Sequence, residues 1–297
     1  MVKVVACFVT CGDFDTVECW KRWKDDHVGY AIHAAHVSKE DDAKISEFVR
    51  ETNALRIPEV YTQWSSFEVV IAQEKLLTSA RLHYPEATHF LIVSQNSIPM
   101  VSTHDLLQKI CDRCASKSLF DWYSWDTQGT VEEQLMNAFG MCAVASKQFV
   151  IWSREHIDSC SDMTLKIANY GITHAMYPSK TIPIAPDEYV RQSVFWHLHG
   201  SNEWCASMCV IAHFKPNSER ASYRTRAFLK YKVPILIQRT RTIESPAAFF
   251  DCLCYGVRKV RRADVDFAIN VLTAQKVLPA VRNVSRVGRI FKRGSNA

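Results

Sequence analysis

The sequence has 297 residues, of which 47% are hydrophobic and 23% are charged, as is ordinary for a globular protein with a full core. Its length suits one large α/β domain or two smaller ones. No apolar stretch approaches the roughly 20 residues that span a bilayer, so the sequence predicts no transmembrane anchor. The start of the chain also lacks the charged flank and cleavage site of a signal peptide.

Cysteine content and charge distribution narrow the protein class further. The eleven cysteines form an odd set, which favours reduced thiols in a cytosolic compartment over a disulfide framework. From Lys215 to the end there are 18 Lys and Arg against 5 Asp and Glu, a net charge of +13, which leaves −8 for the first 214 residues. Such a basic segment meets nucleic acid, anionic lipid headgroups or the phosphates of a small ligand, and charge alone does not separate these.

Strand and helix patterns alternate through the first third of the chain. Short β-branched runs predict buried strands, and apolar residues at helical spacing predict amphipathic helices. The predicted strands are 2–10, 30–36, 60–61 and a run that begins at 89, and the predicted helices are 16–26, 40–52 and 67–82. This β-α-β order is typical of a nucleotide-type α/β domain with a parallel sheet.

The pattern after Pro99 is less regular. Helices are predicted at 103–115, at 153–162 with a serine cap, at 189–199 and at 267–281, and strands at 206–213 and 233–238. Residues 140–152 favour paired strands or a strand and turn, 178–186 a loop punctuated by proline, and 215–232 a basic loop and helix. We expect one α/β domain over residues 1–245 and a basic helical extension over 246–297 that packs on it.

The segment HFLIVSQNSIPMVS, residues 89–102, is the most suggestive single stretch. Its apolar run predicts a buried strand, and the strand ends in Ser94, Gln95, Asn96 and Ser97. Ligands of open α/β sheets bind beyond the carboxyl ends of the strands, so this strand end is a candidate site. Because it contains no carboxylate, we do not expect a metal ion to be held there by this segment. Ordinary strand-to-loop punctuation would give a similar string.

Six blocks, in order along residues 4–243, resemble the core-2/I-branching β-1,6-N-acetylglucosaminyltransferases (glycosyltransferase family 14). The blocks are the CWKRW helix with the strand that ends at His36, the QWS-FEVVIAQEKLLTSA helix, VSQNSIPMVS, SKQFVIWSREHI, APDEYV and ILIQRTRTI. The resemblance implies a GT-A-like, Rossmann-type nucleotide-sugar fold with a mixed, mostly parallel sheet flanked by helices. It also implies transfer of a sugar from a UDP-sugar to a hydroxyl group. The chain looks like a short viral or microbial version, without the stem, anchor and disulfide framework of the animal Golgi enzymes.

The resemblance also implies roles for particular residues. Glu188 of Ala185-Pro186-Asp187-Glu188 occupies the position of the family's catalytic base, and a basic residue in 235–243 occupies the position that binds the donor diphosphate. The family's Arg-Lys pair reads Arg239-Thr240-Arg241 here, so both arginines remain candidates. Two other positions depart from the family pattern. Trp64-Ser65 stands where the family has Trp-Gly, and Ser38 stands where the family often has an acidic residue after the histidine of the second strand. An Asp-Glu pair at the start of a helix also has a structural explanation in the helix macrodipole.

We expect a metal-independent, inverting reaction without a cofactor. Two sequences have D-x-D form, Asp13–Asp15 and Asp264–Asp266, but neither lies where a donor metal would be held, and both are expected to be surface acids. Fixed cations replace the metal, because the guanidinium fork of arginine matches phosphate oxygens. The residues expected at the donor are Val9, Thr10, Cys11, His36, Trp64, Lys215, Arg239 and Arg241. Those expected at the acceptor are Ser94, Gln95, Asn96, Trp125 and Asp187.

Two functions of different class are compatible with these features. The first is a glycosyltransferase that moves N-acetylglucosamine or xylose to a hydroxyl of a glycan or glycoprotein. The second is a basic protein whose Arg258–Arg262 run and C-terminal tail bind nucleic acid or an anionic membrane, with the α/β part as a scaffold. The tail could also hold a cytoplasmic transferase at the periphery of a membrane. We favour the enzyme, for which nucleic acid is not an expected partner.

Overall fold

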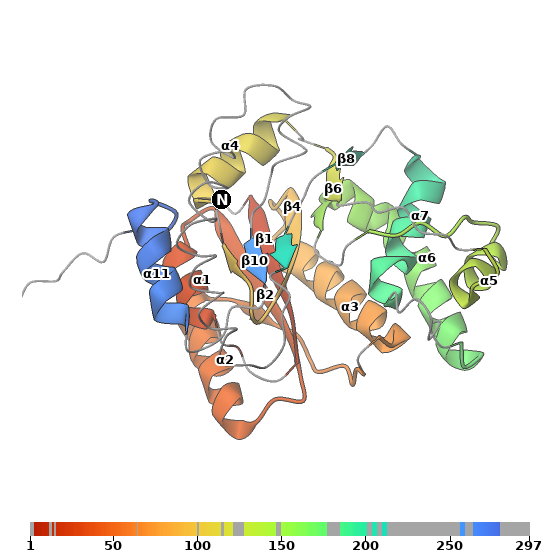
Figure 1. Ribbon diagram of the computed structural model, residues 1–297, viewed down its shortest axis with the longest axis horizontal. Helices are drawn as coiled ribbons and strands as arrows, with labels where there is room; N and C mark the ends of the chain where they lie inside the picture. The colour runs from red at the N-terminus through yellow and green to blue at the C-terminus, as the bar shows by residue number, and fades with distance from the viewer. Residues whose placement is uncertain are drawn as a thin grey trace, which may run out of the picture.

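The structure is a computed structural model, and it describes residues 3–11, 14, 16–63, 65–99, 101–113, 116–120, 128–146, 150–176, 185–200, 204–206, 210–212, 256–258 and 264–279. Within these residues a seven-stranded sheet lies at the centre and helices cover both of its faces (Figure 1). A second sheet of three short strands follows the end of one central strand. None of the described helices has both the length and the hydropathy needed to cross a membrane.

The first half of the chain builds the parallel part of the central sheet. Its elements are β1 (Val4–Cys11), α1 (Val17–Trp23), β2 (Val28–Ala35), α2 (Lys39–Thr52), β3 (Leu55–Arg56), α3 (Phe67–His83) and β4 (His89–Ser94). The four strands are parallel and lie in the order β3-β2-β1-β4. We call the edge of the sheet where β1, β2 and β4 end the carboxyl edge, and the edge where they begin the amino edge.

The alternation of side chains along β1 separates two hydrophobic clusters. Val4, Ala6 and Phe8 face one side, where the Phe8 ring packs edge-on against Trp20 of α1 at 5.1 Å between centroids. Val5 and Cys7 face the other side and pack against the cluster that contains α3 and α6. Successive side chains of a strand point to opposite faces, so this β-branched strand is buried on both.

The second half extends the sheet and adds one reversed strand. Its elements are β5 (Ile98–Pro99), α4 (Thr103–Arg113), β6 (Ser118–Phe120), α5 (Val131–Asn137), β7 (Ile151–Ser153), α6 (Arg154–Thr173), the 3-10 helix η1 (Pro186–Glu188), α7 (Val190–His199), β8 (Trp204–Ala206), β9 (Val210–Ala212), β10 (Gly256–Arg258) and α11 (Val265–Ala274). The complete order is β3-β2-β1-β4-β7-β6-β8, and β7 runs antiparallel to both of its neighbours. The expected α/β fold class, with a mixed, mostly parallel sheet flanked by helices, is therefore confirmed.

Helix α11 belongs to the same core as the N-terminal strands. Ala268, Ile269 and Leu272 lie in the cluster that contains Phe8 and Trp20, and Figure 1 shows α11 beside α1. The described part of the expected C-terminal extension thus shares a core with the sheet. The division of the chain at residue 245 stays a prediction.

Several predicted elements need correction. The short strand expected at Val60-Tyr61 is wrong, because the strand lies at 55–56 and 57–63 form a loop. Residues 140–152 were expected to form paired strands or a strand and turn, and within the described part of this segment one strand of the sheet is present, Ile151–Ser153. Helix α6 begins after its predicted cap, Ser153, whose hydroxyl accepts from the N–H of His156 at 3.4 Å, but it continues to Thr173. The predictions at 215–232 and 233–238 lie outside the described residues.

Candidate active site

The strand order reverses direction between β1 and β4. β2 follows β1 on one side, whereas β4 lies on the other side of β1. A crevice at such a switch point, beyond the carboxyl ends of the strands, is the usual ligand site of open α/β sheets. The register pairs Val9 of β1 with Ser94 of β4, and Thr10 and Cys11 with the end of β2. The structure therefore brings the predicted donor residues of β1 next to the predicted acceptor residue Ser94.

The turn after β4 is built from its own hydroxyl groups. The Ser94 hydroxyl donates to Asn96 Oδ1 at 2.9 Å and lies 2.9 Å from the Ser97 hydroxyl, and the N–H of Ser97 donates to the Ser94 carbonyl at 3.0 Å. Ser94 and Ser97 are buried, whereas Gln95 and Asn96 are half-buried. The hydroxyl of Ser94 thus shapes the turn, and the amide side chains of Gln95 and Asn96 lie closer to its surface.

Side chains of helix α1 and of its N-cap, Thr16, hold this turn by hydrogen bonds to the backbone carbonyls of the turn. The Thr16 hydroxyl lies 2.8 Å from the carbonyl oxygen of Gln95 and 2.6 Å from that of Ser97, and Trp20 Nε1 donates to the Ser97 carbonyl at 2.8 Å. These bonds are buried or partly buried, where a hydrogen bond that is lost leaves a costly unpaired group. The turn between β4 and β5 is therefore a fixed part of the crevice.

The end of β2 carries an unusual backbone conformation at His36. Its φ is 53°, in the left-handed region that residues with a Cβ seldom adopt. The N–H of His36 donates to Glu59 Oε1 at 3.1 Å, and its Nε2 donates to the Thr62 carbonyl at 2.6 Å. In this tautomer Nε2 carries the hydrogen, and Nδ1 can accept a hydrogen bond. Left-handed backbone of this kind is often found at functional sites.

Tyr61 is a feature of this edge that the sequence reasoning missed. Its side chain is 63% exposed, and its ring packs edge-on against His36 with 5.0 Å between centroids. Gln63 Nε2 donates to the Tyr61 hydroxyl at 3.3 Å. An exposed aromatic ring held by neighbours is a suitable stacking surface for a base or a sugar. The Tyr-Thr-Gln-Trp string, with two aromatics in a polar loop, was the available signal.

The Pro186-Asp187-Glu188 segment is anchored against α3. Asp187 is buried, and its carboxylate accepts from Gln73 Nε2 at 3.0 Å, while its carbonyl accepts from Gln192 Nε2 at 3.1 Å. Glu188 is half-buried, and its carbonyl accepts from the N–H of Ser146 at 3.0 Å. Asp187 and Glu188, both predicted from the sequence, thus differ in burial, and Glu188 is the more accessible carboxylate.

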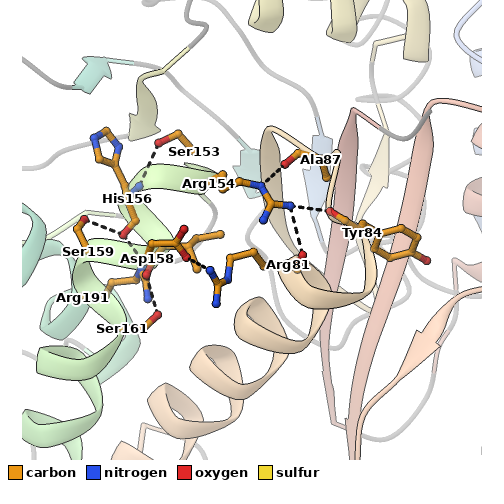
Figure 2. Close-up of polar contacts among 11 residues, drawn as sticks. Arg81, Tyr84, Ala87, Ser153, Arg154, His156, Asp158, Ser159, Ser161 and Arg191 are labelled. Atoms are coloured by element: carbon orange, nitrogen blue, oxygen red, sulfur yellow. Dashed lines mark hydrogen bonds and ion pairs between the residues drawn. The ribbon is translucent and has the colours of Figure 1, made fainter.

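A buried ion pair at the start of α7 strengthens this anchor. Arg191 pairs with Glu74, the residue after Gln73. Its Nη2 also donates to the carbonyls of His156 at 3.1 Å and Ile157 at 3.2 Å, and Figure 2 shows Arg191 beside His156. The guanidinium also lies over the Trp152 ring, 4.5 Å from its centroid. α3 begins at the carboxyl edge, and Gln73 is less than two turns from its start. The anchors therefore hold Glu188 in the half of the domain that contains the switch point.

The second sheet brings part of the basic C-terminal third to the same region. β10 pairs antiparallel with β5, with Val257 opposite Ile98 and Gly256 opposite Pro99, and it pairs parallel with β9. β5 begins four residues after Ser94, so β10 lies beside the segment that follows the turn at the end of β4. The backbone of Arg258, the first residue of the Arg258–Arg262 run, continues this register towards that turn.

Some predicted residues cannot be placed, and one is corrected. Trp64, Trp125, Lys215, Arg239, Arg241 and the Asp13–Asp15 pair lie outside the described residues. Asp264, expected to be a surface acid, is fully buried at the start of α11. Within the described ranges, no three His, Cys, Asp or Glu side chains form a group that could hold a metal ion.

Comparison with known proteins gives a limited result. No model of a known protein family matches the sequence, and no curated protein matches it. Among solved structures, S. aureus TarS is similar at 10% identity with a TM-score of 0.39, over 92% of this chain and 44% of TarS. Residues 1–349 of S. aureus TarS in complex with UDP are similar at 8% identity with a TM-score of 0.39, over 92% of this chain and 72% of that one. This chain thus spans less than half of the first of these proteins.

Proposed function

We propose that this protein is a metal-independent, inverting glycosyltransferase. It moves a sugar, N-acetylglucosamine or xylose, from a UDP-sugar to a hydroxyl of a glycan or glycoprotein. The observation that carries the proposal is the half-buried Glu188, on a turn tied to α3 by the Asp187–Gln73 bond and the Glu74–Arg191 pair. The resemblance of the Pro-Asp-Glu segment to the core-2/I-branching family supports the same reading.

In the proposed reaction Glu188 acts as the general base. Its carboxylate takes the proton of the acceptor hydroxyl while the hydroxyl oxygen attacks the anomeric carbon, and the bond from that carbon to the UDP oxygen breaks. A base of this kind contributes about 10²- to 10⁴-fold in rate. With a single base on the face opposite the leaving group, the reaction inverts the anomeric centre, whereas retention would need a second nucleophile.

The donor would lie in the crevice between β1, β2 and the turn after β4. Val9, Thr10, Cys11 and His36 would line it, with the exposed ring of Tyr61 available to stack on the uracil. The acceptor would lie between that turn and Glu188, within reach of Gln95 and Asn96. Cations from the basic third would stabilise the departing diphosphate. Arg239, Arg241 and Lys215 remain the candidates, and the pairing of β10 with β5 supports a route for this third to the crevice.

The test is donor turnover with a panel of UDP-sugars in the presence of EDTA. We expect hydrolysis or transfer that persists under chelation and falls by about 10²- to 10⁴-fold in Glu188→Gln. Glu155→Gln, an exposed carboxylate at the start of α6, removes the same charge elsewhere and should keep wild-type turnover. Absence of turnover with every donor, together with tight and salt-sensitive binding of RNA or liposomes, would favour the basic binding protein instead.

A further inference from the structure

An open pocket of about 460 Å³ lies between the ends of α1 and α11 and the start of α4. Lys24 and Asp25, in its wall, lie between α1 and the first residue of β2, so the pocket is at the amino edge of the sheet. β2 has eight residues, and at about 3.3 Å per residue it spans roughly 25 Å. The pocket is therefore well separated from the carboxyl edge where the candidate active site lies.

Three cations and one carboxylate line this pocket. Arg22 pairs with Glu18 at 3.0 Å, and Lys24 donates to the neutral carbonyl of Thr52 at 2.6 Å, so the charge of Lys24 is not balanced by an acid there. Lys276 is exposed and has no ion pair among the described residues. Asp25 Oδ1 accepts from the N–H of His27 at 2.8 Å. The lining thus has a net positive charge.

Hydroxyl groups and a helix start complete the wall. Ser102 caps α4 by accepting from the N–H of Asp105 at 3.1 Å, and Thr103 is the first residue of that helix. Thr273 of α11 also lines the pocket, and its hydroxyl oxygen is buried without a hydrogen-bond partner. This oxygen has almost no solvent-accessible surface, so it faces the protein interior and not the pocket.

The backbone at Lys276 also favours a functional role for this lysine. Lys276 follows the cap of α11 with a φ of 57°. Its N–H donates to the Thr273 carbonyl, and that of Val277 donates to the Leu272 carbonyl. This is the Schellman pattern, in which the left-handed position is usually glycine. With lysine at this position the backbone is strained, and the residue lies in the pocket wall.

We propose that this pocket binds a phosphate-bearing anion. Phosphate oxygens match the Arg22 guanidinium, the two ammonium groups and the N-terminal end of α4. The chain continues from Pro279, in the pocket wall, into residues 280–297, which contain five Lys and Arg and no Asp or Glu. A positively charged tail is not a suitable occupant of a pocket that is itself positively charged. The phosphate belongs either to a lipid headgroup or to a free small molecule.

The first experiment measures the thermal unfolding midpoint of the full chain with increasing inorganic phosphate. A ligand that binds only the folded state raises this midpoint in a saturable way. We expect a saturable rise for the wild type and an apparent affinity about five- to tenfold weaker in Lys276→Gly, which loses one charge-assisted contact. Lys276→Gly is safe for the fold, because glycine is the preferred residue at this backbone position.

Two further variants separate binding from backbone effects. Ala175→Gly makes the same backbone change at the equivalent left-handed position after α6, outside the pocket, and should keep the full response to phosphate. Thr273→Val removes a hydroxyl that does not face the pocket, so its response to phosphate should equal that of the wild type. An equal response to phosphate in all four proteins, or no saturable response in the wild type, would overturn the proposal.

The source of the phosphate is tested with vesicles. Sedimentation with phosphatidylcholine vesicles, with and without phosphatidylinositol phosphate, reports headgroup binding. Binding that needs the phosphorylated lipid and weakens in Lys276→Gly supports a lipid headgroup, whereas a response to inorganic phosphate alone supports a free anion. All of these readouts are independent of glycosyl transfer, so a failure of the proposed transferase function would leave the phosphate-site proposal unaffected.

Discussion

The carboxylate of Asp187 accepts a hydrogen bond from the Gln73 side-chain amide at 3.0 Å, between two residues that are almost fully buried. The residues that follow Asp187 and Gln73 lie in different environments. Glu188 is half-buried, whereas Glu74 is buried and pairs with Arg191. Adjacent residues of α3 therefore hold the Pro186–Glu188 turn and the start of α7. In this arrangement Asp187 positions the turn, and Glu188 is the more accessible of its two carboxylates.

The first prediction concerns Gln73. Gln73→Met keeps the side-chain length but removes the donor, which leaves the Asp187 carboxylate buried without this partner. We expect a loss of about 1–3 kcal/mol in the free energy of unfolding, measured by urea denaturation. If Glu188 is the base, kcat should fall while KM changes little, because the turn loses its position but the donor crevice does not. Gln134→Met, on an exposed side of α5, should change neither quantity.

The second prediction concerns the Glu74–Arg191 pair. Removal of one partner leaves a buried charge, so Glu74→Leu and Arg191→Leu should each cost about 3–5 kcal/mol. The double variant leaves neither charge unpaired and should cost less than the sum of the two. A double-mutant cycle from urea denaturation measures this coupling. Strictly additive losses would show that the pair contributes nothing as a pair.

The central elements were predictable because each carries its own signal. α3 has buried residues along one face, including Leu76 and Leu77, and β4 is an apolar run whose six residues are all buried. Helix α6 was predicted too short. The polar string after Cys160 interrupts its apolar pattern, yet Thr164 and Ile167 are buried against neighbouring elements. Tertiary packing, rather than local sequence, sets the length of this helix.

The candidate site was predictable only in part, for a related reason. Strand ends and the Pro-Asp-Glu string are local features, and they indicated Ser94 and Glu188. The anchors of the turn are not local, since Gln73 and Asp187 are 114 residues apart and Glu74 and Arg191 are 117 residues apart. β10 has three residues and no pattern of its own, and it becomes a strand because β5 and β9 lie beside it. Such pairings depend on contacts between distant segments of the chain.

The third prediction concerns the effect of pH through His156. Its Nδ1 lies 2.8 Å from the Ser118 hydroxyl, and burial, followed by the nearby His199, Arg191 and His89, lowers its pKa to about 4. An unfolded histidine has a pKa of about 6.5. Because the folded protein takes up this proton less readily, its contribution to stability is complete above about pH 6.5 and is lost as the pH falls towards 4.

The measurement is the urea midpoint at about pH 7 and about pH 5, on the two sides of the histidine pKa in the unfolded chain. We expect the midpoint to fall between these values in the wild type and to fall less in His156→Asn, which places an amide near the position of Nδ1. His83→Asn, at an exposed position at the end of α3, should keep the wild-type dependence. An equally steep fall in His156→Asn would assign the effect to other groups, such as His33, whose pKa burial also lowers.

The fourth prediction concerns the contact between α3 and α6. A Cβ added to Gly171 would lie 2.6 Å from a ring atom of Phe67, the first residue of α3. Although alanine favours a helix over glycine by about 1 kcal/mol, the overlap should dominate, and Gly171→Ala should destabilise the fold by about 1–3 kcal/mol. Four residues further on, Ala175 has a φ of 49° after the end of the same helix, where glycine is preferred. Ala175→Gly should therefore stabilise the fold by about 1 kcal/mol.

Thermal unfolding of both variants tests these opposite signs within one stretch of chain. Phe67→Leu combined with Gly171→Ala should recover part of the loss, because the smaller side chain makes room for the new methyl group. Phe67→Leu alone should destabilise, since Phe67 is buried against α6. The double variant should thus be more stable than the sum of the two single changes predicts. If Gly171→Ala were neutral or stabilising, the close approach of Phe67 to the backbone of α6 would be wrong, and the start of α3, which follows the Tyr61 loop, would have to be placed differently.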